Sequence, residues 1–300
     1  MYFGETSEEV KQVQKRLLEL GFSLPRYGAD GVCGSETWEA LHQYAKTELG
    51  SWEPEVPESV LIALESDPEP VPVPPDPGGD LDGAVILDLR DEQSDPSPKS
   101  KVVNGHTVMR NPKSIRGIVL HQTACTYGVS QQQINAAGGD KELALHRRSL
   151  NVACHVMAFR DGVTVVNNEF ERYIFAANGQ NAESVSVETE GNYPGLTDEP
   201  EKTTWNPPPN VVTDEVVLAA RAAMHYLVQE ARRLGAPVEF VWAHRQSSAS
   251  RRADPGQELW ERVVLQYAVP VLGLKTECGR TWGDGRPIPI EWDPDGVGRY

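Results

Sequence analysis

The sequence contains no long apolar run and no basic N-terminal stretch. No segment approaches the roughly 20 consecutive apolar residues that a membrane helix requires, so we expect no insertion into a membrane. Residues Met1–Glu9 include neither a basic start nor an apolar core, and the sequence therefore predicts no secretory signal peptide. We expect the chain to be made in the cytoplasm, with any export following another route.

Concentrated positive charge is also missing. The formal net charge is −16, and residues 53–100 hold thirteen acidic residues against two basic ones, a local balance of −11. Phosphate binding requires a concentrated basic surface, so nucleic acid is excluded as an expected partner. We interpret the acidic stretch as a solvated, self-repelling spacer.

Cysteine is scarce, and its four occurrences are widely separated: Cys33, Cys125, Cys154 and Cys278. None of them forms a Cys-x-x-Cys pair, which argues against a structural zinc ribbon. The sequence leaves two alternatives for these residues, which are one disulfide bond or thiols buried as small apolar side chains.

The N-terminal part of the chain has the pattern of a small helical domain. Ser7 can cap a helix whose apolar residues lie largely on one face, and Gly21 provides its end. A second helix is predicted to begin at Ser35 and a shorter third one at Ser59. About 65 residues is near the lower limit for an independent core, so we expect a simple three-helix unit over residues 1–66.

Composition divides the rest of the chain into three parts. Residues 67–83 are acidic and repeat proline without hydrophobic periodicity, which predicts an extended, semi-rigid linker. Residues 84–273 are predicted to form the main domain. Residues 274–300 are rich in glycine and proline, and we expect an irregular extension that packs on this domain.

The main domain alternates short apolar runs with helical patterns. The strongest helical pattern begins at Thr213 or Asp214 and ends at Gly235. Interleaved strands and helices predict an α/β fold with a mixed central β-sheet flanked by helices. The strands that we predict cover residues 115–121, 154–160, 163–166, 184–190 and 238–244.

Two histidines and one aspartate have the composition of a metal site. His121 ends one predicted strand and His244 ends another, and the ends of neighbouring strands in an open α/β sheet meet on one rim. Asp254 follows ten residues later, before Pro255 and Gly256, which can fix a turn. Two imidazoles, one carboxylate and a position open to water match a catalytic zinc site. On spacing alone, structural histidines that form hydrogen bonds remain the alternative.

A general base and a cation are also candidates. Glu188 shares one face of its predicted strand with Glu190, which fits either a solvated strand face or a base that takes a proton from attacking water. Arg252 lies two residues before Asp254, so an extended chain would direct both the same way. Arg252 is therefore either a surface arginine or a fixed cation that stabilises an oxyanion.

These residues lie in segments that resemble the zinc N-acetylmuramoyl-L-alanine amidases. That family includes bacterial recycling amidases, phage endolysins and animal peptidoglycan recognition proteins. Four separated segments in the family's order are more specific than any one of them alone. The resemblance covers roughly Ile115 to Trp260 and rests on Gly117–Thr123, Ala153–Gly162, Ser184–Gly191, and Ala243–Arg245 together with Arg252–Gly256.

The resemblance implies a role for each candidate residue. Glu188 matches the catalytic glutamate, and Arg252 stands where the family usually has lysine. His155 matches a histidine that lines the site and is assigned to substrate contact. The tyrosine that some phage members place just before that histidine is Cys154 here, which favours Glu188 as the base. The implied ligands of one zinc ion are His121, His244 and Asp254.

The N-terminal segments Val10–Phe22 and Asp30–Leu41 resemble a small peptidoglycan-binding module. Asp30, Gly31 and Gly34 are interpreted there as turn formers, and no ligand contact is assigned. Tethering such a module would raise the local concentration of an enzyme on an insoluble polymer.

The combined resemblance implies a monomeric hydrolase that acts on bacterial peptidoglycan. We expect it to cleave the amide bond between N-acetylmuramic acid and L-alanine, as a phage endolysin that reaches the wall after release through a holin pore. The presence of Asp254 as a third ligand favours catalysis. The alternatives are a protein that recognises peptidoglycan without cutting it and an intracellular amidase that recycles soluble muropeptides.

Overall fold

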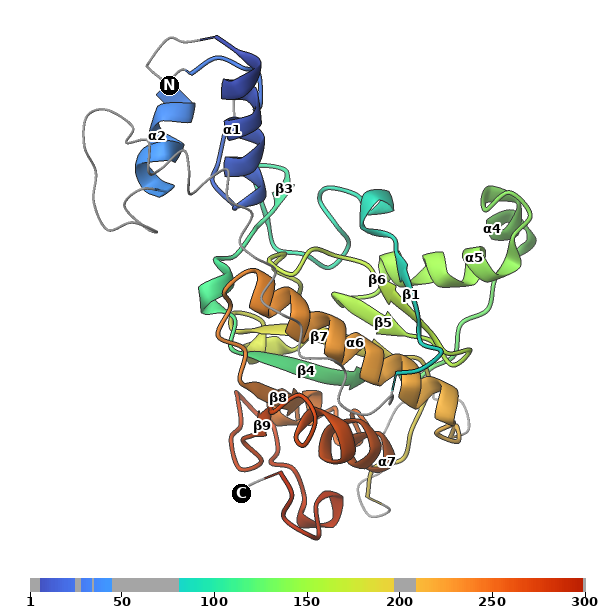
Figure 1. Ribbon diagram of the computed structural model, residues 1–300. Helices are drawn as coiled ribbons and strands as arrows, with labels where there is room; N and C mark the ends of the chain where they lie inside the picture. Colours follow the sequence, from blue (N-terminus) through green and yellow to red (C-terminus); the bar gives the residue numbers. More distant parts are fainter. Residues whose placement is uncertain (1–5, 25–27, 34, 45–80, 197–208, 299–300) are drawn as a thin grey trace. The chain divides into compact units, whose positions relative to one another are not determined.

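The computed structural model describes residues 6–24, 28–33, 35–44, 81–196 and 209–298 (Figure 1). The chain divides into two compact units, Met1–Val73 and Pro74–Tyr300. The helix predicted at Ser59 and most of the predicted linker lie outside the described residues, so the domain boundaries stay a prediction. None of the described helices is long and apolar enough to cross a membrane.

The N-terminal unit contains two described helices, α1 (Glu8–Glu19) and α2 (Ser35–Tyr44). The hydroxyl of Ser7 accepts a hydrogen bond from the backbone N–H of Val10 at 3.1 Å, which confirms the predicted cap. Gln14 is buried between the helices, and its amide donates to the Asp30 carboxylate at 2.8 Å and the Thr37 hydroxyl at 2.8 Å. The Asp30 carboxylate also accepts from the backbone N–H of Val32, as a turn former does.

The second unit is built on a seven-stranded sheet with the strand order β1-β6-β5-β7-β4-β8-β9. β5 and β6 pair antiparallel and the other neighbours pair parallel, so the predicted mixed sheet is confirmed. The strands are β1 (Val85–Asp88), β4 (Gly117–Gln122), β5 (Val156–Ala158), β6 (Val163–Val166), β7 (Ser184–Thr189), β8 (Phe240–Ala243) and β9 (Lys275–Thr276). A separate ribbon joins β2 (Val102–Val103) and β3 (His106–Thr107).

Helices flank this sheet. α6 (Asp214–Arg233) begins at the Thr213 cap and ends before Gly235, as predicted. The remaining helices are α4 (Gln131–Ala136), α5 (Lys141–His146), α7 (Gln257–Leu259) and the π-helical segment η7 (Trp260–Ala268). Short 3-10 turns are η2 (Arg90–Glu92), η3 (Pro112–Ser114), η4 (Arg147–Asn151), η5 (Asn178–Gln180), η6 (His244–Ser247) and η8 (Ile290–Trp292).

The two faces of the sheet differ in chemistry. Ile118 and Leu120 of β4 pack with Val185 and Val187 of β7 in the apolar core that includes α6, which crosses this face in Figure 1. Because side chains alternate along a strand, the residues between them point to the opposite face. That opposite face carries Ser184, Ser186 and Glu188 of β7 and His121 of β4.

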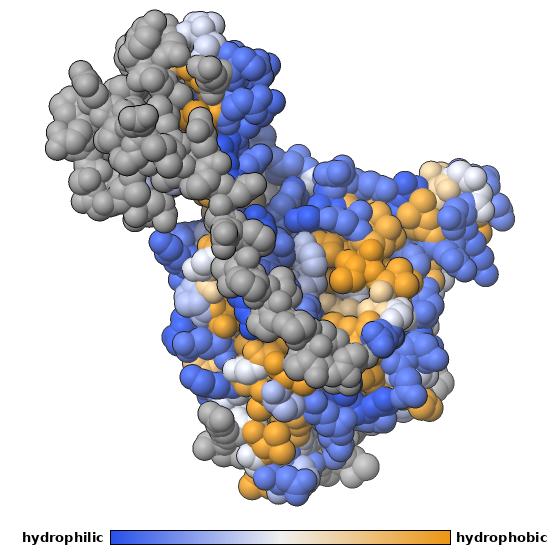
Figure 2. Space-filling model, in the orientation of Figure 1, coloured by the Kyte–Doolittle hydropathy of each residue, from blue (hydrophilic) through white to orange (hydrophobic). Residues whose placement is uncertain are grey.

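The edge of the sheet at β1 is less well covered. Val85 and Ile86 are 53% and 48% exposed, and Figure 2 shows apolar residues on the surface over the region of β1. At the other edge, the segment predicted to be wholly irregular contributes β9. The N–H of Lys275 donates to the carbonyl of Glu239 at 2.8 Å, so these residues extend the sheet beyond β8.

None of the four cysteines, all of which lie within the described residues, forms a disulfide bond. Cys33, Cys154 and Cys278 are buried, as expected for small apolar side chains, and Cys125 is half-buried. Burial raises the pKa of the Cys154 thiol well above its ordinary value, so this thiol stays protonated.

The half-buried Arg110 and the buried His155 connect β7 to neighbouring loops. Arg110 donates to the carbonyls of Asn181 at 2.7 Å and Ser184 at 2.6 Å. The ring of His155 accepts from the N–H of Ser186 at Nδ1, which places its proton on Nε2, 2.9 Å from the carbonyl of Arg172. Burial and then the charge of Arg110 lower the pKa of His155 from 6.5 to about 3.

The neutral state of His155 predicts an acid-sensitive fold. Below about pH 6.5 the unfolded chain binds a proton on His155 that the folded protein binds only near pH 3. The free energy of unfolding therefore keeps its full value above about pH 6.5 and decreases as the pH falls towards 3. The slope can reach about 1.4 kcal/mol per pH unit. Urea unfolding of His155→Gln between pH 4 and 7 should show a flatter decline than the wild type. Parallel pH profiles would contradict this assignment.

Candidate metal centre

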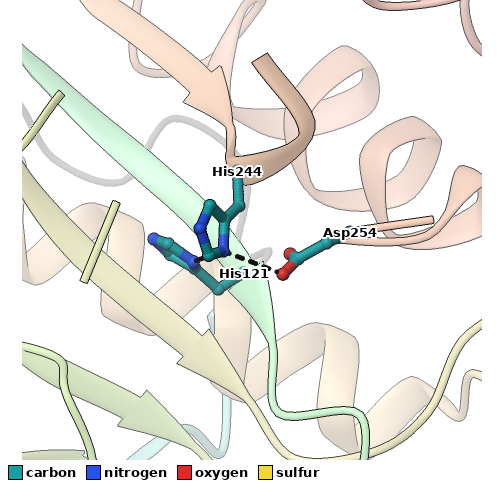
Figure 3. A group of neighbouring side chains, drawn as sticks. All are labelled: His121, His244 and Asp254. Atoms are coloured by element: carbon teal, nitrogen blue, oxygen red, sulfur yellow. Dashed lines mark hydrogen bonds and ion pairs between the residues drawn. The ribbon is translucent and has the colours of Figure 1, made fainter. Parts of the chain in front are cut away.

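Three side chains from separate elements converge at one edge of the sheet. His121 lies in β4, His244 begins η6 directly after β8, and Asp254 lies in the loop before α7. The two Nδ1 atoms are 2.9 Å apart, and Nδ1 of His244 is 3.1 Å from Oδ2 of Asp254. Figure 3 shows the three side chains directed toward one another, and their candidate ligand atoms all lie within 4.8 Å.

Strand register explains why these residues meet. β4 pairs parallel with β7 on one side and β8 on the other, with Leu120 opposite Ala243 and His121 opposite Glu188. His244 follows Ala243, so it is level with His121 at the carboxyl edge of the sheet. This edge is where open α/β sheets place their sites.

Gln122 fastens the aspartate loop to the end of β4. Its N–H donates to Oδ1 of Asp254 at 3.0 Å, which leaves Oδ2 facing the histidines. Its side-chain amide donates to the carbonyls of Tyr193 at 2.8 Å and Ala253 at 3.0 Å. Gly256 completes this loop with φ +108°, where an added Cβ would lie 2.7 Å from the Cβ of Tyr193. The sequence pattern predicted the turn at Pro255 and Gly256, but it gave no indication of the role of Gln122.

The electrostatics suit a bound cation. Burial, and then the nearby His244, lower the pKa of His121 well below its ordinary value, so its imidazole is neutral and can offer a lone pair. Two imidazole nitrogens and one carboxylate oxygen, all buried and facing one point, are a donor set that zinc accepts. The residues present therefore fit one divalent metal ion.

Glu188 lies beside this cluster. Its Oε1 is 3.9 Å from Nδ1 of His121, and the side chain is 14% exposed. Its buried Oε2 has no hydrogen-bond partner among the residues that the structure describes. Burial, and then the charge of Asp254, raise the pKa of Glu188 well above its ordinary value. A carboxyl group in this state can hold a proton and release it.

The neighbouring carboxylate has a different role. Glu190 is buried, and its oxygens accept hydrogen bonds from the backbone N–H groups of Tyr127 at 2.7 Å and Arg160 at 3.2 Å. These bonds connect two loops to the end of β7. The interpretation of Glu188 and Glu190 as a solvated strand face is therefore wrong, because both side chains are turned into the protein.

The two arginines before Asp254 also differ. The positive charge of Arg251 lowers the pKa of both His121 and Glu188, although burial outweighs it for Glu188. The charge of Arg251 therefore acts on the cluster, and the sequence pattern did not indicate this residue. For Arg252 the structure shows its carbonyl accepting from Arg245, and its oxyanion role stays a prediction.

His155 lies below the cluster on the same face, and it is 1% exposed. Both ring nitrogens contact protein groups, Ser186 at Nδ1 and Arg172 at Nε2. The structure assigns His155 a part in the buried network under β7, and its predicted contact with substrate stays a prediction.

Curated relatives match short parts of this chain. One is the N-acetylmuramoyl-L-alanine amidase CwlL of Bacillus licheniformis, 49% identical over 43 residues, which cover 14% of this chain and 12% of CwlL. Another is the type VI secretion system spike protein VgrG3 of Vibrio cholerae, 48% identical over 44 residues, 15% of this chain and 4% of VgrG3. The chain therefore spans only a small part of these relatives.

Solved structures resemble a larger part of it. The N-acetylmuramoyl-L-alanine amidase LysC from Clostridium intestinale URNW is 16% identical, with a TM-score of 0.34, and the match covers 63% of this chain and 98% of LysC. The peptidoglycan recognition protein PGRP-SA of Apis mellifera is 14% identical, with a TM-score of 0.37, and the match covers 67% and 99%.

The family model for N-acetylmuramoyl-L-alanine amidases matches residues 111–257. This range contains His121, Glu188, His244 and Asp254, together with β4, β7 and β8, which place these side chains at one edge. The part of the chain that forms the cluster therefore belongs to the N-acetylmuramoyl-L-alanine amidase family.

Proposed function

We propose that this protein is a zinc-dependent amidase that hydrolyses the bond between N-acetylmuramic acid and L-alanine in peptidoglycan. The observation that carries the proposal is the convergence of His121, His244 and Asp254 beside the half-buried carboxyl group of Glu188. Family membership of residues 111–257 supports the same reaction.

The protein's own residues provide the donors for the metal. His121 and His244 would bind through Nδ1 and Asp254 through Oδ2, while the N–H of Gln122 holds the other carboxylate oxygen away. When bound, zinc supplies Lewis-acid polarisation of the scissile carbonyl and lowers the pKa of a coordinated water to about 7.

Glu188 is the proposed general base. Its position level with His121 places the carboxylate beside the cluster, where it can take a proton from the attacking water. The burial that raises its pKa favours holding that proton until the carboxyl group passes it to the nitrogen of the departing amine. Arg252 is proposed to stabilise the oxyanion, with the charge of Arg251 close by.

The biological role proposed is that of a phage endolysin. The N-terminal unit would hold the enzyme on the bacterial wall, and the acidic, proline-rich stretch 67–83 would separate it from the amidase domain. Access to the wall would follow release through a holin pore, and the protein would act as a monomer.

Loss of one metal donor should abolish tight metal binding. Asp254→Asn keeps the shape of the side chain but removes its charge. Loss of a residue that only supports a ligand lowers metal affinity by about 10–100-fold, and we expect the loss of this donor to lower zinc affinity by more than that. Metal analysis after dialysis should find one zinc per wild-type chain. The control is His106→Ala, since His106 is exposed, pairs with Asp95 and is not among the three candidate donors. Equal zinc content in Asp254→Asn and wild type would reject the site.

Loss of the base should stop catalysis without loss of the metal. Glu188→Gln is isosteric and cannot take the proton, so release of new amino groups from purified peptidoglycan should fall about 10²–10⁴-fold at unchanged zinc content. Glu258→Gln, at a side chain that is 54% exposed, is the matched control. A Glu188→Gln rate near wild type would refute the base. A wild-type protein that binds zinc and peptidoglycan without cutting it would be a recognition protein.

A further inference from the structure

The segment that follows the family-matched range contacts the turn that carries His244. Residues 275–298, here named the C-terminal clamp, lie outside residues 111–257 and inside the same compact unit. We propose that this clamp positions the metal donors His244 and Asp254, and that Arg245 and Gln246 are the positioning residues through which it acts. The proposal rests on the proposed function, because it assumes that the cluster binds a metal.

Gln246 joins the end of β8 to the clamp. Its side-chain amide donates to the carbonyls of Glu277 at 2.7 Å and Arg280 at 2.9 Å. Its own carbonyl accepts from the N–H of Trp282 at 2.8 Å. Its Oε1 accepts from the N–H of Ala243, the last residue of β8, at 2.9 Å. Because both the oxygen and the nitrogen of this buried side-chain amide form hydrogen bonds, Gln246 fixes η6 against the clamp.

Arg245 joins the clamp to the loop that carries Asp254. Its Nη1 donates to the carbonyl of Arg252 at 2.5 Å, and its backbone N–H donates to the carbonyl of Asp254 at 3.2 Å. Toward the clamp, its Nε donates to the carbonyl of Pro287 at 3.0 Å, and its carbonyl accepts from the N–H of Arg286 at 2.8 Å. One buried side chain thus holds the loop and the clamp together, directly beside His244.

The clamp is itself fixed to the core. Trp292 and Ile288 are buried in the main hydrophobic cluster, and the Trp292 ring lies 6.4 Å from that of Trp260. The guanidinium of Arg245 lies 4.9 Å from the centre of the Trp292 ring, a cation–π contact in a buried setting. The clamp therefore provides a rigid surface against which Arg245 is held.

A second anchor lies at the opposite end of the strands. The indole of Trp282 donates to Glu183 at 2.9 Å, and Arg280 bridges Glu183 at 2.9 Å and Glu277 at 2.7 Å. The guanidinium of Arg280 lies 4.3 Å from the centre of the Trp282 ring. Glu183 immediately precedes β7, so the clamp is tied to the same sheet that positions Glu188.

Metal affinity depends on how well the donors are held before the metal arrives. His244 and Asp254 lie beyond the ends of regular strands. From the sheet, Gln122 of β4 bonds to the loop that carries Asp254, and the clamp adds bonds to the turn that carries His244. Supporting bonds of this kind typically account for about 10–100-fold in metal affinity. The clamp supplies these bonds from residues that are not themselves metal donors.

The test compares zinc affinity with stability in the metal-free protein. Arg245→Met keeps the apolar stem against Trp292 but removes the donors to Arg252 and Pro287. We expect its zinc affinity, measured by competition with a chelator, to fall about 10–100-fold, with a smaller fall for Arg245→Lys. Gln246→Met provides an independent second variant in case Arg245→Met does not fold.

The matched control is Arg221→Met. Arg221 also donates twice to one carbonyl, that of Arg262, at 3.1 and 2.8 Å, and lies 5.4 Å from the centre of the Tyr267 ring, on α6 and away from the cluster. The Arg221→Met variant should have a lower thermal stability than the wild type and an unchanged zinc affinity. If Arg245→Met and Gln246→Met lose only stability, as the control does, the clamp has no positioning role. If the wild type binds no zinc, the proposed function fails as well, which distinguishes the two results.

Discussion

The parallel pairing of β4 with β7 and β8 is the constraint on which the site depends. It sets His121 level with Glu188 on one side and brings His244 to the same height on the other. A slip of one residue in either pairing would turn a side chain to the face covered by α6. The apolar residues that alternate with the functional ones prevent this slip, so the hydrophobic core of the sheet also determines the geometry of the cluster.

Sequence patterns predicted the elements with local signals. The Thr213 cap, the hairpin at Gly162 and the strands that contain His121 and Glu188 are each encoded within a few residues, and the structure confirms them. β1 was not predicted, since its four residues follow an acidic stretch and have no alternation. β9 was missed for a related reason: it is two residues long and exists only because β8 offers an open edge.

The supporting residues of the site could not be predicted in the same way. Gln122, Arg245 and Gln246 look like ordinary polar residues in sequence, and their partners lie far along the chain. The choice between Arg251 and Arg252 likewise depends on which side chain the loop turns toward the cluster. Such information resides in tertiary packing. Residue type and spacing nevertheless predicted the three side chains that the structure brings together, because His121 and His244 lie at strand ends and a Pro-Gly turn follows Asp254.

Chain order gives the position of the C-terminal clamp a consequence for biogenesis. A polypeptide translated only as far as Asp254 already contains every donor atom of the cluster, but not the tryptophans and carbonyl groups that hold them. On a ribosome, the amidase domain would therefore emerge with its histidine turn unsupported, and high-affinity loading would wait for some forty further residues. Tight metal binding would then occur only after synthesis of the whole domain.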